Sequence, residues 1–177
     1  MGIRHALLGF LSWKPFSGYE LKKIIAASDS MHWSGNSNQI YPTLVQLHRD
    51  GLVTAKLHEA AHGPARKMYS ITERGRQELT DWLRSEPEQL ETRNAFLVQL
   101  AWADMLRPDD LDGLLATYED QTRMQILMCE EKERRGIVNP ARTPREAYLW
   151  KMIFRNRVEH FRTELSWVRR IRAFLDG

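Results

Sequence analysis

The chain has 177 residues, of which 42% are hydrophobic and 28% charged, and its formal net charge is only +3. This composition is ordinary for a soluble globular protein, and no apolar run approaches the roughly 20 residues that cross a bilayer. The single cysteine, Cys129, excludes an internal disulfide and argues against a structural zinc site.

Two short helices are predicted at the start of the chain. The first, over residues 3–13, carries apolar residues at a spacing of three to four and stops before Pro15. The second begins at a capping box, with Ser17 as the N-cap and Glu20 three residues later. It is expected to end near residues 28–30.

A third helix is predicted after a turn at residues 34–37. Ser37 is its expected N-cap, and Asp50-Gly51 is its expected end. Its apolar stripe consists of Ile40, Leu44 and Leu47. The other face carries polar side chains that can contact base edges or phosphates, namely Ser37, Asn38, Gln39, Tyr41, Thr43 and Gln46.

The periodicity then changes from helical to alternating, which predicts a β-hairpin. Its strands lie around residues 53–58 and 69–72, with turn residues at 61–64 between them. A further helix is predicted to open at Thr72. Three helices, a hairpin and a helix within about 85 residues is the element order of a winged helix-turn-helix domain. We place this domain at residues 1–88.

Residues 89–177 are predicted to form a helical dimerisation domain, so the fold class is mainly α with a small β-hairpin. A largely buried helix is expected over residues 93–106, followed by a helix from Pro108 to Arg135. The last helix opens at Thr143, the N-cap of a second capping box, and can run to Leu175. Its length would be about 50 Å at roughly 1.5 Å per residue.

A helix of that length overshoots a small domain, so its apolar stripe needs a further surface to pack against. A second copy of the chain is the simplest source, and we expect a homodimer held by Trp150, Phe154, Val158, Phe161, Leu165 and Val168. Trp102 and Trp150 are candidates to line a pocket for a small aromatic or hydrophobic ligand. Packing in the core or in the dimer interface is the competing interpretation of both tryptophans.

DNA binding is favoured by three features of the first half: its positive charge balance, the polar face of its third helix and the basic residues of its hairpin. Residues 1–85 carry 11 Lys and Arg against 7 Asp and Glu, whereas the remainder carries 15 against 16. Arg66 and Lys67, just after the hairpin turn, can contact phosphates or enter the minor groove. A polar helix face and two edge-strand cations each have a purely structural explanation. Their succession along the chain, helix and then basic hairpin, favours the functional one.

Four strings of the N-terminal domain resemble the PadR family of bacterial transcription regulators: Ser17–Leu21, Gln39–Leu44, Asp50–Val53 and Arg66–Gly75. The C-terminal region is similar in length and helical character to the larger-tail subgroup of that family. The resemblance implies a homodimeric repressor with dimer contacts from its C-terminal helices. It also implies that the helix containing Pro42 reads DNA and that the strand containing Arg66 and Lys67 belongs to the wing. Founding members of the family respond to phenolic acids, and others respond to hydrophobic drugs or unknown signals, but no ligand-site motif of the family carries over to the C-terminal region of this chain.

Catalysis finds no support in the sequence. The six histidines are scattered, and no phosphate-binding glycine loop or metal-ligand spacing is present, so we expect no enzyme, cofactor or metal. The N-terminus lacks a signal-peptide cleavage site, so we expect a cytoplasmic protein without membrane contact. The expected partners are a second copy of the chain, a possible small aromatic or hydrophobic ligand, and double-stranded DNA carrying a pseudo-palindromic operator. The alternative is a winged-helix protein-interaction module that does not bind DNA.

Overall fold

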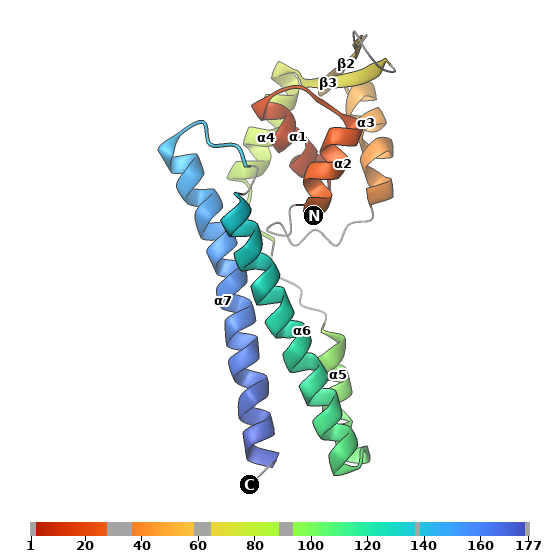
Figure 1. The fold of residues 1–177 in the computed structure, drawn as a ribbon. Coiled ribbons are helices and arrows are strands. Elements are labelled where there is room, and N and C mark those ends of the chain that lie inside the picture. Colours follow the sequence, from red (N-terminus) through yellow and green to blue (C-terminus); the bar gives the residue numbers. More distant parts are fainter. Residues whose placement is uncertain (1–2, 28–36, 59–64, 89–93, 137–138, 176–177) are drawn as a thin grey trace. The chain divides into compact units, whose positions relative to one another are not determined.

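The computed structural model describes residues 3–27, 37–58, 65–88, 94–136 and 139–175. The chain divides into two compact units, Met1–Gln89 and Leu90–Gly177 (Figure 1). The predicted fold class, mainly α with a small sheet, is confirmed. Within the described residues, no helix combines the length and apolar character that crossing a membrane requires.

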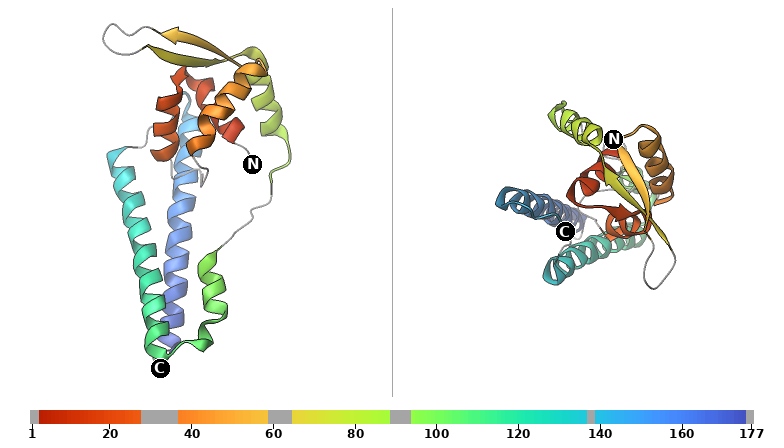
Figure 2. Two further views of the ribbon diagram at one scale, coloured as in Figure 1. Left: turned by 90° about the vertical axis from the view of Figure 1, so that its right-hand side faces the viewer. Right: turned by 90° about the horizontal axis from the view of Figure 1, so that it is seen from above.

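The N-terminal unit packs four helices with a small antiparallel sheet. The helices are α1 (Ile3–Trp13), α2 (Gly18–Ala27), α3 (Ile40–Arg49) and α4 (Glu73–Arg84). The strands are β1 (Phe16–Ser17), β2 (Val53–His58) and β3 (Arg66–Ile71), in the order β1-β3-β2 (Figure 2). The predicted hairpin is therefore present, and a two-residue third strand, which the alternation pattern is too short to reveal, pairs with β3. The predicted turn at residues 61–64 lies outside the described residues.

The capping box at the start of α2 is confirmed. The backbone N–H of Ser17 donates to Glu20 Oε2 at 2.7 Å, and the N–H of Glu20 donates to Ser17 Oγ at 3.2 Å. The pKa of the Glu20 carboxyl is lowered, chiefly by the hydrogen bond from the Ser17 backbone N–H and then by the one from the Ser17 hydroxyl, which donates to Oε2 at 2.7 Å. The predicted start of α4 is confirmed as well, and Thr72 is its N-cap, since Thr72 Oγ1 accepts from the N–H of Gly75 at 3.1 Å.

The predicted N-cap at Ser37 is wrong. Ser37–Gln39 form one turn of 3₁₀ helix, and α3 begins at Ile40 with Gln39 in the N-cap position. Pro42 explains the difference. An α-helix from Ser37 would need a hydrogen bond from residue 42 to the carbonyl of Asn38, but proline lacks the N–H and its ring clashes with that carbonyl.

The core of the N-terminal unit lies between the helices and the sheet. It contains the stripe predicted for α3, because Ile40, Leu44 and Leu47 are fully buried. Gly75 lets α4 approach the segment between α3 and β2 closely, since a Cβ at this position would lie 2.2 Å from the carbonyl oxygen of Leu52. One face of α3 is therefore packed against the core, and its opposite face is in solvent.

The C-terminal unit consists of α5 (Ala95–Ala101), a 3₁₀ turn (Ala103–Met105) and two long helices, α6 (Pro108–Arg135) and α7 (Pro144–Leu175). The helices α6 and α7 run side by side in opposite directions (Figures 1 and 2). The prediction of one largely buried helix over residues 93–106 is wrong. The helix ends at Ala101, and only one of its faces, around Phe96, packs within the unit. A helix of seven residues cannot bury two faces against one pair of helices.

The apolar stripe of α7 is covered by α6 of the same chain. Phe154 and Val158 pack with Cys129, and Val168 packs with Leu115. The other three residues expected in the dimer interface, Trp150, Phe161 and Leu165, are partly buried. The stripe therefore does not need a second copy to cover it, which removes the reason for placing the dimer contacts there.

Charged side chains join α6 to α7 along their length. Glu119, only 7% exposed, accepts from Arg169 Nε and Arg172 Nη1, both at 2.9 Å. Farther along, Arg162 Nη2 donates to Glu130 Oε1 at 2.8 Å. These bonds set the pairing of the two helices, because each partner lies on the opposite helix.

Candidate nucleic-acid interface

The helix α3 presents an exposed face opposite its buried stripe. Of the residues predicted to contact DNA, Asn38, Gln39, Tyr41, Pro42 and Gln46 are exposed and Thr43 is partly buried. The side chain of Ser37 lies outside the described residues. The helix therefore offers an accessible polar face at its N-terminal end, as a helix that reads a major groove requires.

Gln46 is held by a neighbour at the other end of this face. Its Nε2 donates to Asp50 Oδ1 at 2.7 Å, while Asp50 Oδ2 accepts from Arg4 Nη1, also at 2.7 Å. The Arg4 guanidinium is the main cause of the lowered pKa of the Asp50 carboxyl. The Gln46 amide is thus directed along its own helix, which leaves the N-terminal half of the face as the better base-reading surface.

Val45, which a pattern of polar residues does not indicate, lies on the same face and is 60% exposed. The signal was an apolar residue outside the Ile40, Leu44 and Leu47 stripe, which an amphipathic helix does not need for its core. A valine in this position can contact the methyl group of thymine.

The two predicted wing cations lie on β3, beyond the part that β1 covers. Arg66 pairs with His58 of β2 and Lys67 with Leu57, whereas β1 reaches only as far as Met68. Both cations are exposed. Lys67 Nζ lies 5.7 Å from the ring centre of Tyr69, a distance at which a cation and an aromatic ring attract each other.

One groove brings residues of α3 and of the basic strand β3 together. It has a volume of about 520 Å³ and is lined by Ser17, Gly18, Tyr19, Tyr41, Arg66, Lys67 and Tyr69. The structure thus joins three residues predicted separately, Tyr41, Arg66 and Lys67. It adds two tyrosines that the sequence analysis did not select, of which Tyr19 lies within the first of the four family-like strings.

The C-terminal unit, called the tail below, does not bring together Trp102 and Trp150, the two tryptophans of the suggested effector pocket. Trp102 follows α5, which packs near Trp167 and Val168 at the end of α7, and it is 70% exposed. Trp150 lies 17 residues before Trp167 in the same helix, about 25 Å away along the helix axis. Together they line no common pocket within the described residues of one chain.

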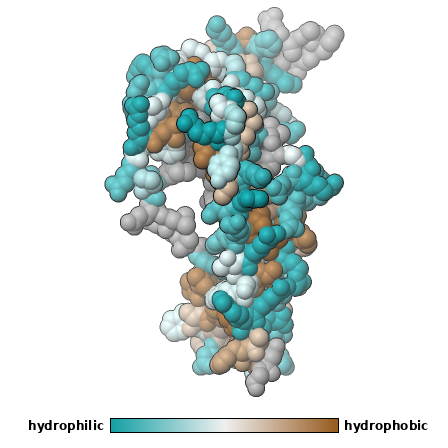
Figure 3. Space-filling view, turned by 90° about the vertical axis from the view of Figure 1, so that its left-hand side faces the viewer, coloured by the Kyte–Doolittle hydropathy of each residue, from teal (hydrophilic) through white to brown (hydrophobic). Residues whose placement is uncertain are grey.

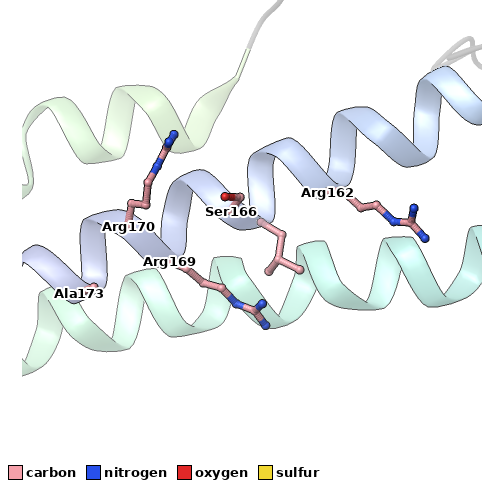
Figure 4. A pocket seen from close by; sticks show the side chains of 6 residues that line it. Arg162, Ser166, Arg169, Arg170 and Ala173 are labelled. Atoms are coloured by element: carbon pink, nitrogen blue, oxygen red, sulfur yellow. The ribbon is translucent and has the colours of Figure 1, made fainter.

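A different, shallow pocket of about 340 Å³ lies along α7 (Figure 4). It is lined by Arg162, Leu165, Ser166, Arg169, Arg170 and Ala173. Arg162 and Arg169 are engaged by glutamates of α6, so two of its three cations already hold carboxylates. Among the residues that the structure describes, no three His, Cys, Asp or Glu side chains form a metal-binding group.

Both units of the chain are similar to known protein families. Residues 7–81 match the model of the transcriptional regulator PadR-like family, and residues 92–176 match that of the virulence activator alpha C-terminal region. The chain is similar to the negative transcriptional regulator PadR of Bacillus subtilis, with 24% identity across 98% of this chain and 97% of that protein.

Solved structures show the same fold across both units. Bacillus subtilis PadR in complex with operator DNA matches with a TM-score of 0.84 and 22% identity, covering 98% of each chain. The same protein in complex with p-coumaric acid matches with a TM-score of 0.79 and 23% identity, covering 99% of this chain and 96% of that one. The Vibrio cholerae virulence activator AphA matches with a TM-score of 0.75 and 24% identity, covering 99% of this chain and 98% of that one. Relatives with this fold thus include a negative regulator and an activator.

Proposed function

Because the chain belongs to the PadR-like family of transcriptional regulators, we propose that it is a cytoplasmic, homodimeric repressor that binds a pseudo-palindromic DNA operator. The helix α3 enters the major groove, and the strand carrying Arg66 and Lys67 contacts the phosphate backbone. The observation that carries this proposal is the groove that joins α3 to the basic strand. A protein-interaction module has no need to combine a polar helix face with cations in this way.

The dimer is proposed to form through the outward faces of the tail helices. On α6, Met124, Leu127 and Met128 are exposed, and on α7 so are Leu149 and Met152. Apolar surface is visible in several places along the tail helices (Figure 3). A second copy would remove this surface from water, and a two-fold axis would present two α3 helices to half-sites about 10 bp apart or a multiple of that distance.

A small aromatic or hydrophobic effector is proposed to release the operator. The p-coumaric acid complex of Bacillus subtilis PadR supports this class of ligand. The separation of Trp102 from Trp150 argues that any ligand contacting both would have to bind where two chains meet. Titration of the protein–operator complex with aromatic acids and with hydrophobic drugs tests the class directly, and release by neither would refute it.

The decisive experiment is selection of bound duplexes from a random pool, followed by gel shifts of two variants. Gln39→Ala is expected to lose discrimination between sequences, and Lys67→Ala to weaken all sequences alike, because amides read bases and lysines neutralise phosphates. Binding should also weaken steeply as salt rises. A wild-type protein that retains no duplex at low salt would instead favour an interaction module.

A further inference from the structure

The groove between α2, α3 and β3 combines aromatic walls with a cationic rim. Tyr19 and Tyr41 are 66% and 48% exposed, whereas Tyr69 at the base is only 5% exposed. The pKa of the Tyr69 hydroxyl is raised, mainly by burial and further by the nearby Tyr41. Tyr69 therefore stays protonated in the groove, and its ring attracts the ammonium group of Lys67.

The shape of the groove depends on a glycine. A Cβ at Gly18 would lie 2.6 Å from Tyr41 Cε1, well inside van der Waals contact. The ring of Tyr41 therefore packs directly over the backbone at the start of α2. This contact fixes the ring of Tyr41, a residue of α3, against the first residue of α2.

The charges of the groove favour an anion. Arg66 and Lys67 are exposed at its rim, while Glu20, an acid that interacts with Arg66, is engaged by the backbone and the hydroxyl of Ser17. The groove also includes Gly18 and Tyr19 at the first turn of α2, where the helix dipole is positive. Cations, hydroxyl donors and a helix N-terminus together suit a phosphate group.

We propose that this groove binds one backbone phosphate of the DNA duplex, with the hydroxyl of Tyr19 as a direct donor and Arg66 and Lys67 as its counter-charges. The inference rests on the proposed function, since Tyr41 belongs both to this groove and to the exposed face of α3. A strand whose bases face α3 passes its backbone over the groove at Tyr41. Tyr19 is thus a positioning residue that sets the register of α3 on the duplex.

The test is a scan of the selected duplex in which one phosphate at a time is replaced by an uncharged methylphosphonate. Wild-type protein should lose about tenfold in affinity at one linkage per half-site, as expected for a hydrogen bond to a charged group. Tyr19→Phe should weaken binding to the native duplex and show a smaller loss than wild type at that linkage, where only the charges of Arg66 and Lys67 still respond to the phosphate. Tyr148→Phe, an equally exposed tyrosine of α7, should behave like the wild type throughout.

A second variant tests the geometry without removing a contact group. Gly18→Ala should weaken the native duplex by displacing Tyr41, while circular dichroism stays unchanged because alanine is favourable in a helix. Inorganic phosphate, titrated against the free protein, separates a backbone site from a site for the free anion. Millimolar or weaker binding of free phosphate agrees with a backbone site, whereas tight, Tyr19-dependent binding without any linkage effect overturns the proposal.

The outcomes also separate this inference from the proposed function. If Gln39→Ala loses sequence discrimination while Tyr19→Phe and wild type give identical linkage scans, the groove assignment alone is refuted. If no duplex is bound at low salt, the DNA-binding proposal fails first, and the groove assignment fails with it.

Discussion

The two units of the chain bury their apolar residues in different ways. Among the described residues, the N-terminal unit gathers fourteen buried residues into one cluster between helices and sheet. The tail has two separate clusters of three buried residues each, one between α6 and α7 and one that also includes Phe96 of α5. Large apolar side chains remain exposed on every helix of the tail, among them Val98, Met124 and Leu149.

This difference indicates which unit can stand alone. One continuous core with capped helices gives the N-terminal unit its own stability, so its outer face is free to carry polar groups for DNA. Two paired helices bury only one face each, and their remaining apolar surface favours association. The tail is therefore expected to be the part whose stability depends on a partner.

The largest expected effect comes from a charge on the outward face of α6. Leu127→Lys would place an ammonium group in the proposed dimer interface, and two-fold symmetry would place it there twice. We expect dimer affinity to fall about 1,000-fold, or about 4 kcal/mol at the level of interface hot spots. Sedimentation measures this, and Gln125→Lys on the same helix is the control. A Leu127→Lys protein that stays dimeric would place the interface elsewhere.

In the N-terminal unit the largest effect is expected for Gly75→Ala. The new Cβ would overlap the carbonyl oxygen of Leu52, which is backbone and cannot move aside, so we expect a loss of about 3 kcal/mol. Hydrogen exchange should quicken in α4 and leave α6 unchanged. Gly113→Ala on α6 is the matched control, since a Cβ there meets nothing within 4 Å and should stabilise the helix by up to about 1 kcal/mol. Equal acceleration in both units would mean that they unfold together.

The charged contacts of the tail give the next effect. Glu119→Gln should destabilise the tail by about 2 kcal/mol, less than for a fully buried pair because the partner arginines are partly exposed. The pKa of Glu119 is lowered, chiefly by hydrogen bonds from Arg169 and then Arg172. Its ionised form is thus favoured in the folded state.

This shift has a defined pH dependence. The stabilisation is complete above the unfolded carboxyl pKa of about 4.3 and is lost as the pH falls through the lower folded value. The difference in melting temperature between wild type and Glu119→Gln should therefore shrink as the pH falls below about 4.3. A difference that is constant over this range would mean that the glutamate charge has no part in the effect.

Much of the N-terminal unit could be predicted from the sequence because its signals are local. The capping box at Ser17 and the α3 stripe each depend on residues within a few positions of one another, and both are present in the structure. The start of α3 was misplaced because the backbone constraint of Pro42 outweighs the capping preference of Ser37.

The tail was harder to predict because its contacts are distant in sequence. Periodicity showed that one face of α7 must be covered, but not whether α6 or a second chain covers it. Likewise Gly18 and Tyr41 lie 23 positions apart, and no local pattern indicates that one makes room for the other. The groove could only be found in three dimensions.

The smallest predicted effect concerns Val45, where an exposed apolar residue interrupts the polar face of α3. If it contacts a thymine methyl group, replacing that thymine by uracil removes one methyl from the interface, worth about 0.8 kcal/mol or roughly fourfold in affinity. Val45→Ala should bind both duplexes equally, because its side chain no longer reaches the methyl. Val45→Thr keeps a methyl branch and should retain most of the difference. Equal discrimination by wild type and Val45→Ala would leave Val45 without a role in reading sequence and would return that role to Gln39 and Tyr41.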